Sequence, residues 1–197
     1  FEFLTGNSMA FMPAGSVPYQ QFVKSEMPSL ASQLGSLGYT TAALHPYYAS
    51  GWNRDQVYPD LGFEDTYFRD DFTNASTLRG YVDDRSAFEK LIELYEDKEE
   101  NERLFAFEVT MQNHGGYSKE YPDLEPEGTQ IHATEKYLTL IKKTDEAFEE
   151  LLQYFSNQNE KTIILMFGDH QPSDYICNPI LRMLGLDENA RDSSLEE

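Results

Sequence analysis

Basic side chains are scarce in this 197-residue chain, which carries 15 Lys+Arg against 35 Asp+Glu and a formal net charge of -20 at pH 7. A surface of that sign repels phosphate backbones, which argues against nucleic acid as a partner. Cysteine is scarcer still, because Cys177 is the only one. No internal disulfide and no cysteine-rich zinc site can form, but bacterial secreted proteins can also lack disulfides, so the compartment stays open.

Long apolar runs are also missing. No stretch approaches the roughly 18 to 20 apolar residues of a membrane-spanning helix, and the N-terminus lacks the charged and then apolar pattern of a signal peptide. The chain nevertheless has the material for a core, since 40% of its residues are hydrophobic and 14% are aromatic. We expect residues 1–197 to form a single domain, cut from a longer protein, because the chain opens at Phe1 without an initiator Met.

The hydrophobic pattern alternates three times between a helical period and a short, nearly continuous apolar run. Predicted helices cover residues 28–37, 83–95 and 132–155, and the predicted strands that follow them cover 39–44, 104–111 and 162–167. Apolar strands separated by amphipathic helices indicate a mostly parallel sheet with helices on both faces. The sequence therefore predicts an α/β fold, a three-layer sandwich.

Three of the four histidines follow the predicted strands: His45, His114 and His170. Ligands of open α/β sheets bind beyond the carboxyl ends of the strands, so these side chains are candidates for one shared pocket. The alternative for each is a solvated or hydrogen-bonded loop histidine.

Asp169 and His170 form the sharpest local motif. A carboxylate and an imidazole side by side at a strand end supply two ligands for a divalent cation. Gly168 before them permits the close backbone approach of a crowded site. The alternative is that Asp169 starts a turn and caps the backbone that follows.

An aromatic ring, an amide and a guanidinium stand together in Trp52, Asn53 and Arg54, in the loop after the first predicted strand. Arg54 has the planar donor geometry that binds phosphate or sulfate through two hydrogen bonds. In the alternative interpretation Arg54 makes a surface ion pair with Asp55 or Asp60, and Trp52 belongs to the core.

These motifs resemble those of one family. Phe1–Gly6, Trp52–Asp55, Leu61–Phe63, Met111–His114 and Gly168–His170 occur in the order found in lipoteichoic acid synthase-like enzymes. The resemblance runs from residue 1 to about Pro172 and is to the extracellular sulfatase-like domain of that family. It implies the alkaline phosphatase superfamily fold with a divalent metal site for Mn or Mg.

Residue by residue, the resemblance implies that Asp169 and His170 bind the metal. It implies that Trp52, Arg54 and His114 line a pocket for a glycerol phosphate head group. The family's nucleophilic threonine and a further acidic metal ligand match positions upstream of Phe1, so we assign no catalytic residue in this chain. C-terminal strands of the family fold are expected to be missing as well, and the isolated piece is expected to be inactive.

The activity implied for the complete protein is that of a phosphoglycerol transferase, membrane-anchored at the extracytoplasmic face of a bacterial cell membrane. Its implied partners are a phosphatidylglycerol-type lipid and a growing glycerol phosphate polymer of lipoteichoic acid type. Two alternatives stay open. One is a sulfatase or phosphodiesterase of the same superfamily, and the other is a noncatalytic domain that binds an anionic glycan.

Overall fold

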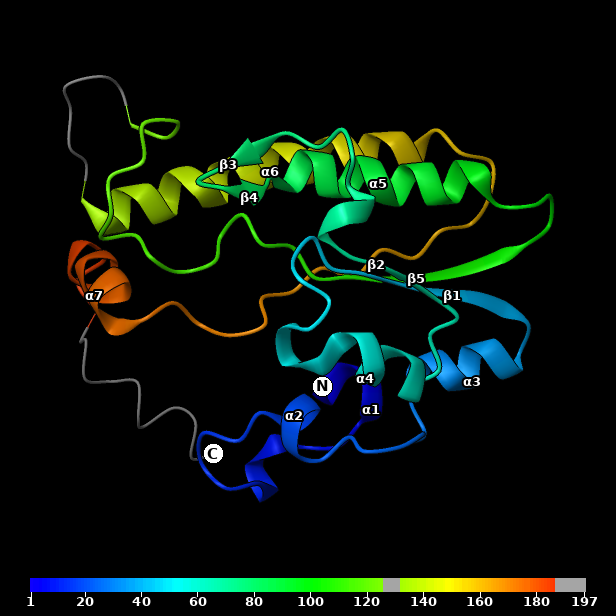
Figure 1. Cartoon of the computed structure of the whole chain (residues 1–197). Coiled ribbons are helices and arrows are strands. Elements are labelled where there is room, and N and C mark those ends of the chain that lie inside the picture. Colours follow the sequence, from blue (N-terminus) through cyan, green and yellow to red (C-terminus); the bar gives the residue numbers. More distant parts are fainter. Residues whose placement is uncertain (126–131, 187–197) are drawn as a thin grey trace. The chain divides into compact units, whose positions relative to one another are not determined.

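The computed structural model describes residues 1–125 and 132–186 (Figure 1). The chain divides into two compact units, Phe1–Gln112 (the first unit) and Asn113–Glu197 (the second unit). Among the helices in the described ranges, none combines the length and the apolar character needed to cross a bilayer.

A parallel sheet of three strands forms the centre of the first unit. Its order is β2 (Asp65–Tyr67), β1 (Tyr39–Leu44) and β5 (Arg103–Glu108), and both pairings are parallel. Leu44 stands opposite Tyr67 on one side and Glu108 on the other. The three carboxyl ends therefore lie at one edge, as predicted for the strands over 39–44 and 104–111.

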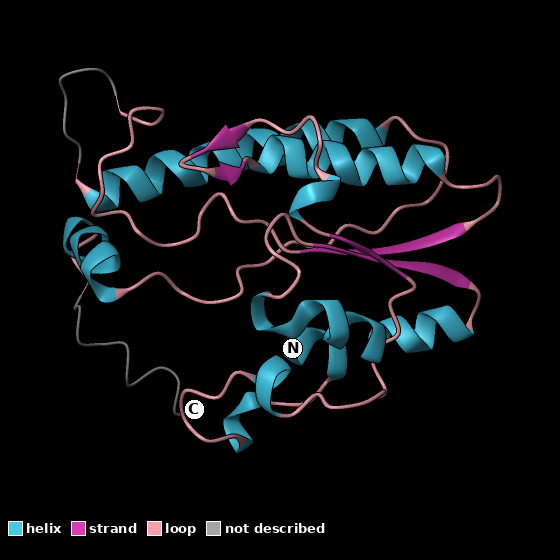
Figure 2. Ribbon diagram, in the orientation of Figure 1, coloured by secondary structure: helices cyan, strands magenta, loops and turns pink. Residues whose placement is uncertain are grey.

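Both faces of this sheet are buried, which makes the first unit three-layered (Figure 2). Ala43, Phe105 and Phe107 belong to a core beneath one face, and Ala42 and Leu44 belong to a second core beneath the other. This alternation explains why the strands are apolar at nearly every position. The layer on the first face is made of α1 (Glu2–Thr5), α2 (Pro18–Gln21), α3 (Leu30–Ser36) and α4 (Arg54–Asp60).

The opposite layer is α5 (Asp84–Asp97), whose Ala87 packs into the second core. The short elements of the first unit are η1 (Met9–Phe11), η2 (Gly51–Asn53), η3 (Arg69–Asp71), β3 (Thr77–Leu78) and β4 (Tyr81–Val82), the last two pairing as an antiparallel hairpin. The predicted α/β sandwich is thus confirmed.

Helix boundaries follow local capping chemistry. Asp83 caps α5 by accepting from the Ser86 backbone N–H at 2.8 Å. In α3 the N-cap is Ser29, so the helix predicted over 28–37 begins two residues later than predicted. Gly38 follows α3 with φ +80, a left-handed conformation that ends the helix.

The second unit contains two helices in its described part, α6 (Ala133–Ser156) and α7 (Asp174–Met183). The prediction for residues 132–155 matches α6 to within one residue at each end. Thr134 Oγ1 donates to the Ile176 carbonyl at 3.1 Å, which joins α7 to α6. Lys136 forms a buried ion pair with Glu125 at 2.6 Å, which fastens the segment before α6 to the helix.

The predicted strand over 162–167 does not form. Across the described residues of the second unit there is no strand, and this segment has no ladder partner. Most of its side chains are exposed to solvent, with Ile163 96% and Phe167 53% exposed. An apolar β-branched run predicts burial, but a strand also requires a neighbour that accepts its backbone hydrogen bonds.

An uncharged β-prone segment with exposed side chains is a site for association between chains. We expect Ile163→Lys to slow aggregation of the 197-residue chain, measured by light scattering at 37 °C and micromolar concentration. Ile164→Lys is the matched control: this neighbouring side chain is half-buried, so its replacement should lower the melting temperature instead. Equal aggregation rates for Ile163→Lys and wild type would contradict the prediction.

Candidate functional site

The loop after β1 begins at the carboxyl edge of the sheet with His45, which is 1% exposed, and leads through η2 into α4. Trp52 and Asn53 both have left-handed backbones, with φ 56 and φ 58. Asparagine adopts this conformation fairly readily, but a bulky residue such as Trp52 does so only where surrounding contacts hold it there. In this turn of the backbone Trp52 is 51% exposed, while Arg54 is only 8% exposed.

Arg54 is held in place by several contacts. Its Nη1 donates to the Gly51 carbonyl at 2.9 Å, its guanidinium carbon lies 5.1 Å from the centre of the Trp52 ring, and it hydrogen-bonds the Tyr58 side chain. Burial lowers the pKa of Arg54, and the adjacent Tyr58 opposes that shift. Arginine stays protonated under such a shift, so Arg54 is a fixed cation beneath an exposed ring.

Gly51 makes this arrangement possible. A Cβ at that position would lie 2.8 Å from Arg54 Nη1, closer than real contacts allow. The sequence motif predicted Trp52 and Arg54 as a pair, but the roles of Gly51 and Tyr58 depend on distances that a motif does not contain.

Both structural alternatives for this motif are wrong. Trp52 is exposed rather than part of the core. Arg54 is buried rather than on the surface, and none of the ion pairs in the described ranges includes it. The role of Trp52 and Arg54 as an anion-binding pair stays a prediction.

His114 lies in the second unit, in a loop anchored to α6. Asn113 Nδ2 donates to Thr144 Oγ1 at 2.8 Å, and the Tyr117 hydroxyl donates to the Asn113 carbonyl. The Tyr117 ring packs edge-on against Tyr137 at 5.7 Å. These contacts fix the backbone on both sides of His114 and leave its side chain exposed.

Asp169 and His170 are brought together in the loop before α7. Asp169 Oδ1 lies 3.8 Å from His170 Nε2, and both side chains are largely exposed. His170 Nδ1 lies 2.9 Å from the Gln171 carbonyl. A carbonyl accepts a hydrogen bond, so Nδ1 is the donor in this contact and Nε2 is the ring nitrogen nearer Asp169.

A metal-ligating histidine commonly donates its other ring N–H to a carbonyl, so Nε2 of His170 and the Asp169 carboxylate are donors of a type that suits a divalent cation. No cluster of three or more His, Cys, Asp or Glu side chains suited to a metal occurs within residues 1–125 and 132–186. Asp169 and His170 are therefore a two-donor arrangement. They belong to the second unit, as His114 does, whereas Trp52, Arg54 and His45 belong to the first.

One carboxyl group at the sheet edge was missed by sequence reasoning. Glu108 ends β5, and both of its carboxylate oxygens are covered from solvent, with no hydrogen-bond partner in the described part of the chain. Burial, reinforced by the nearby carboxylate of Asp84, raises the pKa of Glu108 to about 8. Its position inside an apolar run gave no sign of this environment.

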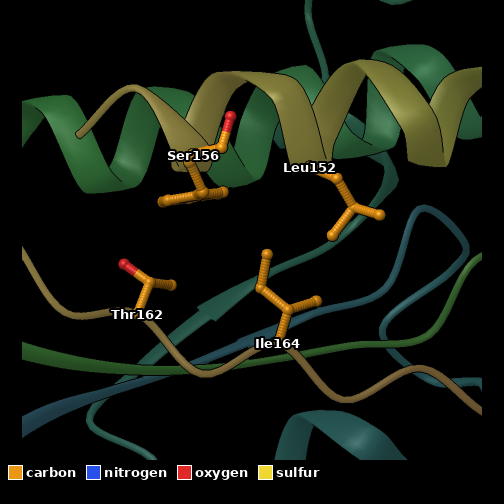
Figure 3. A pocket seen from close by; sticks show the side chains of 5 residues that line it. Leu152, Ser156, Thr162 and Ile164 are labelled. Carbon is orange, nitrogen blue, oxygen red and sulfur yellow. The ribbon is translucent and has the colours of Figure 1, made fainter.

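A surface pocket of about 320 Å³ in the second unit lies elsewhere (Figure 3). Its walls are Leu152, Phe155, Ser156, Thr162 and Ile164, from the end of α6 and the segment after it. None of these side chains is ionisable, so the pocket offers no acid, base or metal ligand.

A parallel sheet of three strands, with layers of helices on both faces, defines an α/β sandwich domain. The sulfatase family model matches residues 1–183, and the chain belongs to the sulfatase family. Its sequence is similar to those of lipoteichoic acid synthases, and its fold is that of solved members of the alkaline phosphatase superfamily.

Two curated relatives illustrate this placement. The "Putative cyclic beta-1,2-glucan modification protein" of Rhizobium meliloti is 36% identical over 182 residues, which are 87% of this chain and 28% of that protein. Lipoteichoic acid synthase 1 of Bacillus subtilis is 26% identical over 180 residues, which are 86% of this chain and 27% of that protein. The chain thus spans little more than a quarter of the length of these relatives.

Two solved structures have the same fold. The lipoteichoic acid synthase LtaP from Listeria monocytogenes aligns with a TM-score of 0.64 at 24% identity, covering 79% of this chain and 38% of that one. The Streptococcus pyogenes phosphoglycerol transferase GacH, solved with sn-glycerol-1-phosphate, also aligns with a TM-score of 0.64 at 24% identity. The alignment covers 81% of this chain and 44% of that one.

Proposed function

We propose that this chain is the substrate-binding part of an extracytoplasmic, metal-dependent phosphoglycerol transferase. The donor is a phosphatidylglycerol-type lipid, and the product is a glycerol phosphate polymer of lipoteichoic acid type. The observation that carries the proposal is the Trp52–Arg54 pair, a buried, fixed guanidinium under an exposed ring at the carboxyl edge of the sheet.

The pair suits a glycerol phosphate head group. A guanidinium can bind two oxygens of one phosphate, and its partial burial strengthens that interaction over the same contact in water. The exposed face of Trp52 offers apolar contact to the glycerol carbons. His114 orients the phosphate or protonates the leaving alcohol, in keeping with its anchored backbone and exposed side chain.

Asp169 and His170 would hold the cation, either Mn or Mg, with His170 binding through Nε2. When bound, a divalent cation lowers the proton affinity of a nucleophile and stabilises charge on phosphoryl oxygens. The nucleophile of the proposal is the family's threonine, for which no residue of this chain is a candidate.

Two relatives bear on the proposal in different ways. The GacH structure contains sn-glycerol-1-phosphate, the head-group chemistry proposed here. The relative from Rhizobium meliloti, at 36% identity, is named for modification of a cyclic β-1,2-glucan rather than for lipoteichoic acid synthesis. The second candidate function is therefore hydrolysis or transfer of another ester by the same site.

A reconstituted assay tests the proposal. The full-length protein that carries this domain, placed with phosphatidylglycerol liposomes and Mn, should release diacylglycerol, while the isolated 197-residue chain should not turn over. Hydrolysis of p-nitrophenyl sulfate, measured in parallel, should stay at background. Sulfate-ester hydrolysis without diacylglycerol release would favour a sulfatase, and multiple turnovers by the isolated chain would overturn the assignment of the nucleophile.

A further inference from the structure

The loop after β1 presents a second aromatic–arginine pair. Arg69 Nη1 donates to the Tyr48 hydroxyl at 2.9 Å, and the Arg69 guanidinium carbon lies 5.2 Å from the Tyr48 ring centre. The corresponding separation between Arg54 and Trp52 is 5.1 Å. Tyr48 is 53% and Trp52 is 51% exposed. Two half-exposed rings, each braced by an arginine, therefore stand on one loop.

Tyr48 is rigid as well as exposed. Its ring meets that of Tyr47 edge-on at 4.9 Å, and Tyr47 in turn contacts Tyr81 at 6.3 Å. The Arg69 backbone N–H donates to the Tyr47 carbonyl at 3.1 Å, which ties η3 to the loop. A ring held in this way has already lost its rotamer freedom, so a ligand that stacks on it meets little further ordering cost.

The two rings begin at neighbouring points of the backbone. The Gly51 N–H donates to the Tyr48 carbonyl at 3.0 Å, which closes a tight turn, and Trp52 is the next residue. The ends of such a turn lie within about 7 Å of each other. The two side chains therefore start from one short stretch of the loop after β1, and that loop begins at the carboxyl edge of the sheet, where open α/β sheets bind their ligands.

The charge around Tyr48 favours a neutral ligand. Asp70 and Asp71 follow Arg69 directly and are exposed, so this short segment carries two carboxylates for one guanidinium. A second phosphate would be repelled there, whereas carboxylates and a guanidinium together bind hydroxyl groups. The face of an aromatic ring carries partial negative charge and attracts weakly positive C–H groups.

A pyranose ring offers both features, a face of C–H groups and a rim of hydroxyls. We propose that Tyr48 and Arg69 form a subsite for a sugar ring of a neutral glycan, next to the anion subsite of Trp52 and Arg54. Binding of a sugar ring at this subsite does not depend on the proposed transferase activity. The assignment of the bound glycan as the acceptor does rest on the proposed function. The acceptor would then approach from the side of Tyr48 while the phosphate occupies the side of Arg54.

Calorimetric titration of the 197-residue chain tests the subsite. The probes are glucose tetrasaccharides with β-1,2, β-1,3 and β-1,4 linkages, and separately sn-glycerol 1-phosphate. Tyr48→Ala should weaken binding of the preferred tetrasaccharide at least about tenfold because the stacking face is lost, and Tyr48→Phe should stay within about threefold because that face is kept. Arg69→Ala should weaken tetrasaccharide binding to an intermediate degree.

Tyr175→Ala is the matched control, since Tyr175 is also 53% exposed but belongs to α7. It should leave tetrasaccharide binding unchanged. Glycerol 1-phosphate binding should survive Tyr48→Ala and weaken in Arg54→Lys, which separates the subsite from the proposed function. The inference is overturned if no tetrasaccharide binds, or if Tyr48→Ala and Tyr175→Ala bind it equally well.

Discussion

Replacing Arg54 by lysine in a full-length protein that carries this domain should lower kcat/KM for a fluorescent phosphatidylglycerol by about a hundredfold, although the charge is kept. A lysine ammonium is a point charge on a flexible stem and cannot bond Gly51, Tyr58 and a phosphate at once. Trp52→Ala should lower turnover as well, because it removes the ring that covers the guanidinium. Arg85→Lys, an exposed replacement on α5, is the control and should leave turnover unchanged.

A second variant separates the position of the guanidinium from its identity. Gly51→Ala keeps the arginine at position 54 but puts a Cβ 2.8 Å from its Nη1, so the guanidinium has to shift from its position. Gly51 is not among the positive-φ glycines, and alanine therefore fits its backbone. We expect Gly51→Ala to reproduce much of the Arg54→Lys defect. Wild-type turnover by both variants, in protein with a normal melting temperature, would refute the role given to Arg54.

Predictability of the fold followed the length and the burial of each element. β1 and β5 were predicted because side chains on both faces of each strand pack against an apolar core, which makes the strand apolar in the sequence. β2 is only three residues long and starts at Asp65, so no periodicity marks it. α7 was missed because Pro179 lies inside it and interrupts a helical interpretation.

The strand prediction for residues 162–167 was wrong for a different reason. Its composition is that of a buried strand, but hydrogen bonds between strands come from a partner, and composition does not say whether a partner is present. The prediction that three strands share one sheet edge is therefore confirmed for β1 and β5, whereas the third predicted strand, over 162–167, does not form. The convergence of His45, His114 and His170 on one cleft stays a prediction.

Site residues were predictable where a motif combines chemically unusual neighbours. Trp52 and Arg54 stand two positions apart, and in the fold they form a pair. Tyr48 and Arg69 are separated by a strand and a helix, so no local pattern joins them. Glu108 is hidden in the same way, since its environment arises only when α5 brings Asp84 close to the end of β5.

Glu108 gives the largest expected effect on stability. Its pKa of about 8 in the folded chain exceeds the ordinary value of 4.5, so the folded state holds a proton that the unfolded chain releases. Below pH 4.5 both states are protonated, and Glu108 adds no pH dependence. As the pH rises from 4.5 to 8 the unfolded state gains from ionisation, so the free energy of unfolding falls, by an amount on the order of 4 kcal/mol.

Glu108→Gln removes this ionisation while keeping the size and polarity of the side chain. Urea unfolding of the 197-residue chain should show the variant more stable than wild type at pH 8, with the difference shrinking towards zero near pH 4.5. Glu89→Gln, an exposed position on α5, should change the free energy of unfolding by less than about 0.5 kcal/mol at either pH. A constant difference between Glu108→Gln and wild type across this range would mean that Glu108 is ionised in the folded chain. The carboxylate would then need a cation or donor at the sheet edge, because its own oxygens find none among the described residues.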